Sequence, residues 1–165
     1  MDLLEKNIDK RPKNRVLMGM DIGKKTIGIA LSDSSQSIAT PLTTIKRTKF
    51  RQDLKALEII IRDYDVGGYV IGYPLNMDGS TGASCQSIRD FAMEFRAQIS
   101  DDLKAGGVPW IAFRDERLST SSVEGLIAAD FNISRRKAKE KGLIDKLAAQ
   151  AILQGALDYI NGGFD

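Results

Sequence analysis

The residues of this sequence that could do chemistry are carboxylates, because its 165 residues include no histidine. The absence of histidine excludes Ser-His and Cys-His nucleophilic sites and every imidazole metal site. Carboxylate oxygens favour hard cations such as Mg²⁺ or Mn²⁺. If the chain is an enzyme, we therefore expect its site to consist of acidic residues that hold such an ion.

Asp21 lies in a run, Met18–Ala30, that otherwise has the pattern of two buried strands joined by a tight turn. A buried carboxylate without a partner is costly, so it must bind a ligand, pair with another group or lie where the strand ends. Asp21 shares a strand face with Leu17 and Gly19. It could instead cap the amides of the following Gly-Lys-Lys turn, since Asp beside Gly is a common turn pair. This segment alone leaves both interpretations open.

Asp145 is the one acid on the apolar face of the last predicted helix. At about 100° per residue, that face also carries Ala149, Ile152 and Ala156. A charge at the helix N-terminal end would by itself interact favourably with the helix dipole, by about 0.3–1 kcal/mol. That interaction would allow any position in the first turn, so the apolar-face position favours a functional role.

Asp115 and Glu116 follow a predicted strand, and they would lie on opposite faces of it if the strand continues. A solvated strand end, paired with Arg114 and Arg117, is an equal alternative. Acids from a central strand, a second strand end and a terminal helix could meet at one end of a sheet. Like charges crowd together only when a cation offsets them. Two divalent ions about 4 Å apart can activate a water and stabilise the leaving oxygen of a phosphodiester.

The elements that must position these acids follow the order β-β-β-α-β-α-β-α-α, which predicts an α/β fold with a five-stranded mixed sheet flanked by helices. The first strand is apolar on both faces and should be central, whereas Pro41 places the third strand at an edge. We expect a flexible N-terminal tail, residues 1–14, and a single domain, residues 15–162. The predicted strands are Val16–Ile22, Thr26–Ser32, Ile38–Ile45, Tyr69–Tyr73 and Val108–Phe113, and the predicted helices are Phe50–Tyr64, Ala83–Leu103, Thr120–Ala129 and Ile144–Ile160.

Composition limits the class of protein. A hydrophobic content of 42% fits one globular domain. A net charge of +2 is too small to indicate nucleic-acid binding by itself. Cys85 is the single cysteine, so no intrachain disulfide can form, and a reducing compartment is favoured. The sequence shows neither a signal-peptide nor a membrane-span pattern, so we expect a cytoplasmic protein with no membrane partner.

Four motifs, DIGKKTIGIA, VIGYPLNMDGS, DERLST and IDKLAAQAILQ, occur in this order between Val16 and Tyr159. With them the chain resembles the YqgF/RuvX family, which is described as Holliday-junction resolvases and as nucleases of the small-subunit ribosomal RNA precursor. The resemblance implies an RNase H-like fold. It also implies that Asp21, Glu116 and Asp145 are catalytic and hold Mg²⁺ or Mn²⁺, which selects Glu116 over Asp115.

The motifs also imply contacts with the nucleic acid. Lys25 matches the family pattern, whereas Lys24 and Thr26 stand where relatives often have Thr and Arg. The loop after Pro74 has an Asp-Gly turn that explains its shape, yet loops at strand ends commonly carry function. The basic segment before Asp145 is either a solvated charge run or a phosphate-binding segment with salt-dependent affinity. The expected substrate-binding residues are Lys25, Asn76, Asp78, Arg117, Arg135, Arg136 and Lys137.

Two other functions fit parts of the pattern. Actin-like ATPases and sugar kinases also begin a phosphate loop with Asp-x-Gly after a first strand, but they usually pair two such domains. A nucleic-acid-binding module could keep the fold without cleavage. The expected partners are structured RNA or branched DNA, together with ribosome-assembly proteins. Both a monomer and a homodimer are compatible with the sequence.

Overall fold

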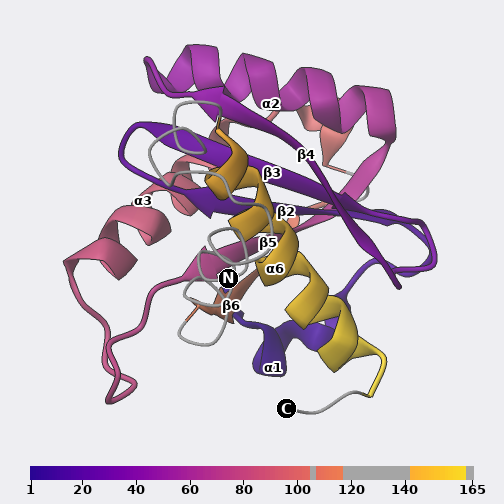
Figure 1. Ribbon diagram of the computed structural model, residues 1–165. Coiled ribbons are helices and arrows are strands. Elements are labelled where there is room, and N and C mark those ends of the chain that lie inside the picture. Colours follow the sequence, from indigo (N-terminus) through magenta and orange to yellow (C-terminus); the bar gives the residue numbers. More distant parts are fainter. Residues whose placement is uncertain (105–106, 117–141, 163–165) are drawn as a thin grey trace.

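A computed structural model describes residues 1–104, 107–116 and 142–162 (Figure 1). Within these residues, six strands form one mixed sheet in the order β1-β6-β5-β2-β3-β4. The predicted α/β fold with a mixed sheet is confirmed, although the sheet has one strand more than predicted. The strands are β1 (Asp2–Leu3), β2 (Val16–Ile22), β3 (Thr26–Ser32), β4 (Ala39–Lys46), β5 (Val66–Tyr73) and β6 (Trp110–Asp115); the helices are α1 (Leu4–Asn7), α2 (Phe50–Tyr64), α3 (Ala83–Gln98) and α6 (Leu143–Ile160), with 3₁₀ turns η1 (Ile8–Lys10) and η2 (Asp101–Leu103).

β2 is central in the sheet, as its two apolar faces predict. It pairs parallel with β5 and antiparallel with β3. β5 continues the sheet by pairing parallel with β6. β4 pairs only with β3 and lies at the edge, with Pro41 opposite Ala30, which confirms the edge position predicted from the proline. The ends of β2, β5 and β6 therefore point the same way and meet at one edge of the sheet.

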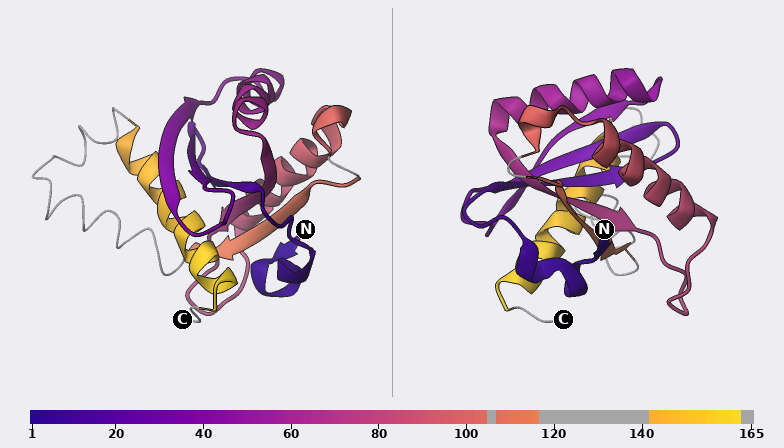
Figure 2. Two further views of the ribbon diagram at one scale, coloured as in Figure 1. Left: turned by 90° about the vertical axis from the view of Figure 1, so that its right-hand side faces the viewer. Right: turned by 180° about the vertical axis from the view of Figure 1, so that it is seen from behind.

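Helices cover both faces of the sheet (Figure 2): α2 and α3 lie on one face and α6 lies on the other. Alternate residues of β2 enter different cores. Met18 and Met20 pack in the core with α2 and α3, whereas Leu17 packs in the core with α6. This division explains why β2 is apolar on both sides, and it places odd-numbered β2 residues, including Asp21, toward α6.

The first residues differ from the predicted flexible tail. β1 pairs parallel with β6, and Leu4 is fully buried. The Asn7 side chain donates to the Ile111 carbonyl at 2.9 Å, and the Trp110 indole donates to the Asn7 carbonyl at 2.9 Å. A two-residue strand followed by one helical turn carries no periodic pattern, and its pairing partner lies over a hundred residues away. Its long-range pairing with β6 is invisible to local sequence analysis.

The third helix ends earlier than predicted. α3 stops at Gln98 because Ile99 leaves the helix with φ −58° and ψ 142°. The next residue, Ser100, donates its hydroxyl to Glu58 Oε1 at 2.7 Å, which ties the chain to α2 before η2 begins. The helix predicted at Thr120–Ala129 lies outside the described residues. No helix in the described part of the chain is long and apolar enough to cross a membrane.

Candidate active site

Asp21 sits near the end of β2, on the face toward α6. Two residues earlier, Gly19 lies so close to α6 that an added Cβ would be 2.7 Å from Leu153 Cβ. Asp21 pairs across the sheet with Gly28 of β3, and its side chain is only partly exposed. In the described residues its side-chain hydrogen bond is to Glu116, not to an amide of the following turn. The turn is closed instead by the Gly23 amide donating to the Thr26 carbonyl at 2.8 Å.

Glu116 follows β6 directly and reaches across β5. Its carboxyl group lies over Gly72, where an added Cβ would overlap Glu116 Oε1 and come within 2.6 Å of Ile152 Cδ1. A residue without a side chain is therefore required at position 72. Glu116, rather than its neighbour Asp115, lines the same cavity as Asp21. The structure thus places Glu116 beside Asp21, and its catalytic role stays a prediction.

Asp145 lies in the first turn of α6, which is held tightly against β3 and β4. A Cβ on Gly28 would overlap the Asp145 carbonyl, so the backbones of β3 and α6 touch at this point. The Thr26 hydroxyl donates to Asp145 Oδ2 at 3.0 Å. The Thr44 hydroxyl donates to the Gly142 carbonyl at 2.6 Å, and Gly142 has φ +67°, which favours glycine. These contacts hold the Asp145 carboxylate in place beside β3, where its charge acts on Asp21, although Asp145 is not among the described residues that line the cavity.

Burial and like charge shift the titration of the first two acids. Burial, followed by the charge of Asp145, raises the pKa of Asp21 from 3.8 to about 6, although the hydrogen bond with Glu116 acts to lower it. Burial also raises the pKa of Glu116 from 4.5 to about 7, with further increases from the charges of Asp21 and Asp115. The pKa values of both carboxyl groups therefore lie above the ordinary values for aspartate and glutamate. Burial thus favours the protonated form of both carboxyl groups at pH values where exposed acids are ionised.

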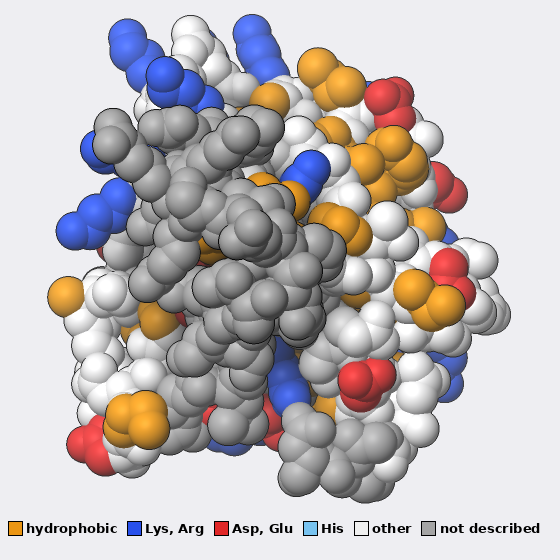
Figure 3. Space-filling model, in the orientation of Figure 1, with side chains coloured by type: hydrophobic (Ala, Val, Ile, Leu, Met, Phe, Trp, Pro, Cys, Tyr) orange, Lys and Arg blue, Asp and Glu red, His pale blue; other side chains and the backbone are white. Residues whose placement is uncertain are grey.

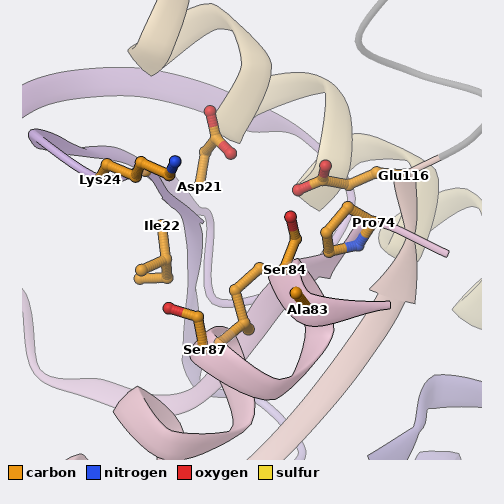
Figure 4. Close-up of a pocket in the computed structure, with 10 residues that line it drawn as sticks. Asp21, Ile22, Lys24, Pro74, Ala83, Ser84, Ser87 and Glu116 are labelled. Carbon is orange, nitrogen blue, oxygen red and sulfur yellow. The ribbon is translucent and has the colours of Figure 1, made fainter. Parts of the chain in front are cut away.

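A cavity of about 350 Å³ opens beside this carboxyl pair (Figure 4). Its walls come from the end of β2 and the following turn, the end of β5, the first turns of α3, and Glu116. The lining residues are Asp21, Ile22, Gly23, Lys24, Pro74, Ala83, Ser84, Ser87, Ile88 and Glu116. The cavity therefore combines two carboxyl groups with one ammonium group and two hydroxyl groups.

The donor set suits a hard cation, because it consists of oxygen atoms and contains no histidine. Asp21 interacts with both other acids: it shares a hydrogen bond with Glu116, and the negative charge of Asp145 raises its pKa. Among the described residues, however, no group of three acidic side chains is already arranged around one common ion position.

The other predicted binding residues fall into three groups. Lys25 is exposed on the β2–β3 turn, and its carbonyl accepts a hydrogen bond from the Arg47 amide at 2.8 Å. Asn76 and Asp78 are exposed and bond with Ser80, closing their loop on itself; neither is among the described residues that line the cavity. Their role in binding stays a prediction. Arg117, Arg135, Arg136 and Lys137 lie outside the described residues.

Two features of the site were not predicted. Lys24, rather than Lys25, lines the cavity, together with Ser84 and Ser87 of α3. Arg47 holds the turn that carries Lys24, by donating its guanidinium to the Gly23 carbonyl at 2.6 Å. The sequence signal for Lys24 was its departure from the family pattern. For Arg47 the sequence offered only a basic run before a helix, which does not specify a contact.

Sequence and structure comparisons agree with this geometry. A family model described as "RuvX: Holliday junction resolvase" matches residues 15–159. A Rhodospirillum centenum protein named "Putative pre-16S rRNA nuclease" is 47% identical over 152 residues, which cover 92% of this chain and 78% of that protein. A Roseobacter denitrificans protein of the same name is 49% identical, covering 90% of this chain and 86% of its own length.

The structure of T. thermophilus RuvC in complex with a Holliday junction substrate superposes with a TM-score of 0.52 at 11% identity, covering 89% of this chain and 96% of RuvC. This likeness, with the order of the sheet strands, defines the RNase H-like class of folds. Among proteins of this fold, the family match and the curated relatives identify one family. The chain belongs to the RuvX family of nucleases.

Proposed function

We propose that this chain is a metal-dependent nuclease that hydrolyses phosphodiester bonds of structured nucleic acid in the cytoplasm. We propose the 5′ end of precursor 16S rRNA as one substrate and branched DNA as the other, following the names of the curated relatives and of the matching family. The observation that carries the proposal is the position of Asp21, which bonds with Glu116 and feels the charge of Asp145 at one edge of the sheet.

Asp21, Glu116 and Asp145 would hold Mg²⁺ or Mn²⁺. When bound, such ions activate water and stabilise the leaving oxygen of a phosphodiester. The protein holds its part of the site ready: Gly72 leaves room for Glu116, and Thr26 orients Asp145. A protonated Asp21 or Glu116 would have to lose its proton before it could act as a ligand, so metal binding would compete with protonation of these two groups.

Hydrolysis of a phosphodiester adds water across a P–O bond and leaves one phosphate end and one hydroxyl end. The negative strand must approach acidic residues, so basic groups have to offset the repulsion. Figure 3 shows lysine and arginine side chains gathered at the upper left of the molecule, the side of the β2–β3 turn and of the start of α2. The active-site edge lies on the same side (Figure 1), which supports approach of the strand from there.

The test compares wild type with Asp21→Asn, Glu116→Gln and Asp145→Asn, each of which keeps shape but removes a charge and a ligand. Cleavage of a four-way DNA junction and of precursor 16S rRNA would be measured with Mg²⁺ or Mn²⁺ and with EDTA. We expect each variant to lose at least about 100-fold in rate. Asp63→Asn, an exposed carboxylate on α2, is the matched control and should cleave normally.

Thermal unfolding separates lost chemistry from lost structure. Without metal the three variants should be as stable as wild type or more stable, because a repulsive charge is removed. If Asp21→Asn cleaves at the wild-type rate, Asp21 only ends its strand and the nuclease proposal fails. If wild type binds both substrates and cleaves neither with any divalent ion, the chain is a binding module of the same fold.

The basic segment before α6 is tested independently. We expect replacement of Arg135, Arg136 and Lys137 by Ala to weaken binding of nucleic acid of every sequence and to flatten its dependence on salt. Unchanged affinity and an unchanged salt slope would identify the segment as a solvated charge run.

A further inference from the structure

We propose that the cavity beside Asp21 and Glu116 binds a backbone phosphate adjacent to the cleaved one, through the ammonium group of Lys24 and the hydroxyl of Ser84. This inference rests on the proposed function and deepens it, because it names a phosphate subsite and the residue that specifies it. The chemistry it recognises, a phosphodiester, is common to RNA and DNA.

The cavity has walls of opposite character. Figure 4 shows the carboxyl groups of Asp21 and Glu116 on one side, and the Ser84 hydroxyl pointing toward them from α3. The Lys24 side chain extends from the turn with its Nζ directed to the Asp21 side of the cavity. In the described part of the chain, no hydrogen bond or ion pair occupies this ammonium group. It is the charge that could neutralise a phosphate there.

The backbone that carries Lys24 is fixed on both sides. Arg47 donates hydrogen bonds to the carbonyl groups of both neighbours of Lys24. Its guanidinium donates to Gly23 O at 2.6 Å, and its backbone amide donates to Lys25 O at 2.8 Å. Arg47 is itself held by the buried carboxylate of Asp53 at 3.9 Å. The turn therefore presents Lys24 from a rigid support, which lowers the entropy lost when its side chain binds.

The opposite wall is fixed as well. Cys85 is buried, and its thiol donates to the Pro74 carbonyl at 3.4 Å, which seats the first turn of α3 against the end of β5. Ser84 and Ser87 flank this contact with exposed side chains that line the cavity. A serine hydroxyl in this position can donate to a phosphate oxygen.

The size and lining of the cavity favour the sugar-phosphate backbone over a base. A volume of about 350 Å³ admits a phosphate with its sugar, and no aromatic side chain is among the described residues that line it. Base binding to single strands relies on aromatic stacking, for which these walls offer no platform. The subsite should therefore contribute affinity without sequence preference.

Binding is measured in EDTA, so that cleavage does not enter. Fluorescence anisotropy with a labelled four-way DNA junction and with an RNA spanning the 5′ end of precursor 16S rRNA would be recorded over a range of salt concentrations. We expect Lys24→Ala to weaken binding about 3- to 10-fold and to lower the salt slope by about 0.7–0.9, the value of one phosphate contact. Lys24→Arg should retain the slope, and Lys55→Ala, an exposed lysine on α2, should change neither quantity.

A second measurement identifies the contact. DNA junctions with a single uncharged methylphosphonate linkage are prepared for each position near the branch point. The linkage that weakens wild-type binding but leaves the affinity of Lys24→Ala unchanged is the one that Lys24 contacts. Ser84→Ala should reduce the penalty at that same linkage.

The outcomes separate the two proposals. If Lys24→Ala binds both probes as tightly as Lys55→Ala does, the proposed phosphate subsite is wrong, even if the enzyme cleaves. The same conclusion follows if the affinity lost in Lys24→Ala adds to the affinity lost at every methylphosphonate position. If Lys24 and one linkage depend on each other but no divalent ion supports cleavage, the subsite stands and the nuclease proposal fails. A response of only the DNA or only the RNA probe assigns the subsite to that nucleic acid.

Discussion

The carboxyl group of Glu116 rests directly on the backbone of Gly72, in the space that a side chain on Gly72 would occupy. Gly72 is in β5, next to β6, and pairs with Arg114 two residues before Glu116. Glu116 can turn inward toward Asp21 only because residue 72 of β5 has no side chain. The glycine is thus part of the site, although it has no group that could react.

We predict that Gly72→Ala impairs activity more than stability. The added methyl group would overlap Glu116 Oε1 and contact Ile152 Cδ1 at 2.6 Å, so Glu116 must move away from Asp21. The cost of overpacking is about 1–3 kcal/mol in the free energy of unfolding. We expect metal-dependent cleavage to fall at least about 100-fold, as measured in single-turnover assays beside urea denaturation.

Gly155→Ala is the control for adding a methyl group to the same region. Gly155 lies inside α6, and its added Cβ would meet the flexible Arg114 side chain no closer than 3.4 Å. Replacing a helical glycine with alanine stabilises by up to about 1 kcal/mol. Equal activity of Gly72→Ala and wild type would show that Glu116 does not act from its place above Gly72.

Thr26 is predicted to position Asp145. Thr26→Val keeps the shape of the side chain but removes the hydroxyl that donates to Asp145 Oδ2 at 3.0 Å. We expect about a 10- to 100-fold loss of cleavage rate and a weaker apparent affinity for Mg²⁺, since loss of a contact that supports a metal ligand typically costs about this much. Thr26→Ser should restore both quantities. A purely structural role would lower the stability of Thr26→Val without changing the Mg²⁺ dependence.

Arg47 is predicted to affect stability and the Lys24 subsite together. Arg47→Lys cannot reach Gly23 O and Asp53 in the same geometry, because a lysine has one donor group where arginine has a planar fork. Asp53 is 2% exposed, so weakening its ion pair should cost about 1–3 kcal/mol. The matched readout is a double variant: with Lys24→Ala already present, Arg47→Lys should cause little further loss of nucleic-acid affinity. Additive losses would separate Arg47 from the subsite.

Asp21 and Asp145 became candidate site residues because each is anomalous in its own local pattern, whereas only the family resemblance selected Glu116 over Asp115. Asp21 interrupts a buried strand, and Asp145 lies on an apolar helix face; both patterns depend only on the regular periods of strands and helices. The β2–β3 hairpin, the central place of β2 and the bounds of α2 follow from the same periods and were predicted within a residue or two.

The contacts that hold the site could not be predicted in this way. The support of Lys24 by Arg47 spans 23 residues, and the bond between Thr26 and Asp145 spans 119. Each depends on how separate elements pack, which no local pattern records. For the same reason β1 was not predicted: its pairing partner, β6, is distant in the sequence.

The stability of the metal-free protein should fall as the pH rises from about 5 to about 8. The folded state raises the pKa of Asp21 to about 6 and that of Glu116 to about 7, above their ordinary values of 3.8 and 4.5. The folded protein therefore holds more protons than the unfolded chain in this window, and a rise in pH favours unfolding. The stabilisation is complete below about pH 4 and is lost as the pH passes through 6 and 7.

A change in stability between pH 5 and 8 can be assigned to the carboxyl pair. The chain has no histidine, and no other type of side chain has an ordinary pKa in this range. Asp33 acts in the opposite sense and elsewhere: hydrogen bonds from Ser35, Ser37 and Ile38 lower its pKa to about 2, so its contribution is lost only in acid. Between pH 5 and 8 we expect the free energy of unfolding to drop on the order of 1–3 kcal/mol.

Urea denaturation in EDTA at a series of pH values measures this drop. Asp21→Asn should flatten the profile, because it removes one titrating group and the charge that acts on the other, whereas Asp63→Asn should leave it unchanged. Millimolar Mg²⁺ should restore stability chiefly at the alkaline end, where both carboxyl groups are ionised and can bind a cation. A profile that is flat for wild type, or a Mg²⁺ effect equal at both ends, would show that Asp21 and Glu116 are not the coupled, metal-binding pair that their geometry indicates.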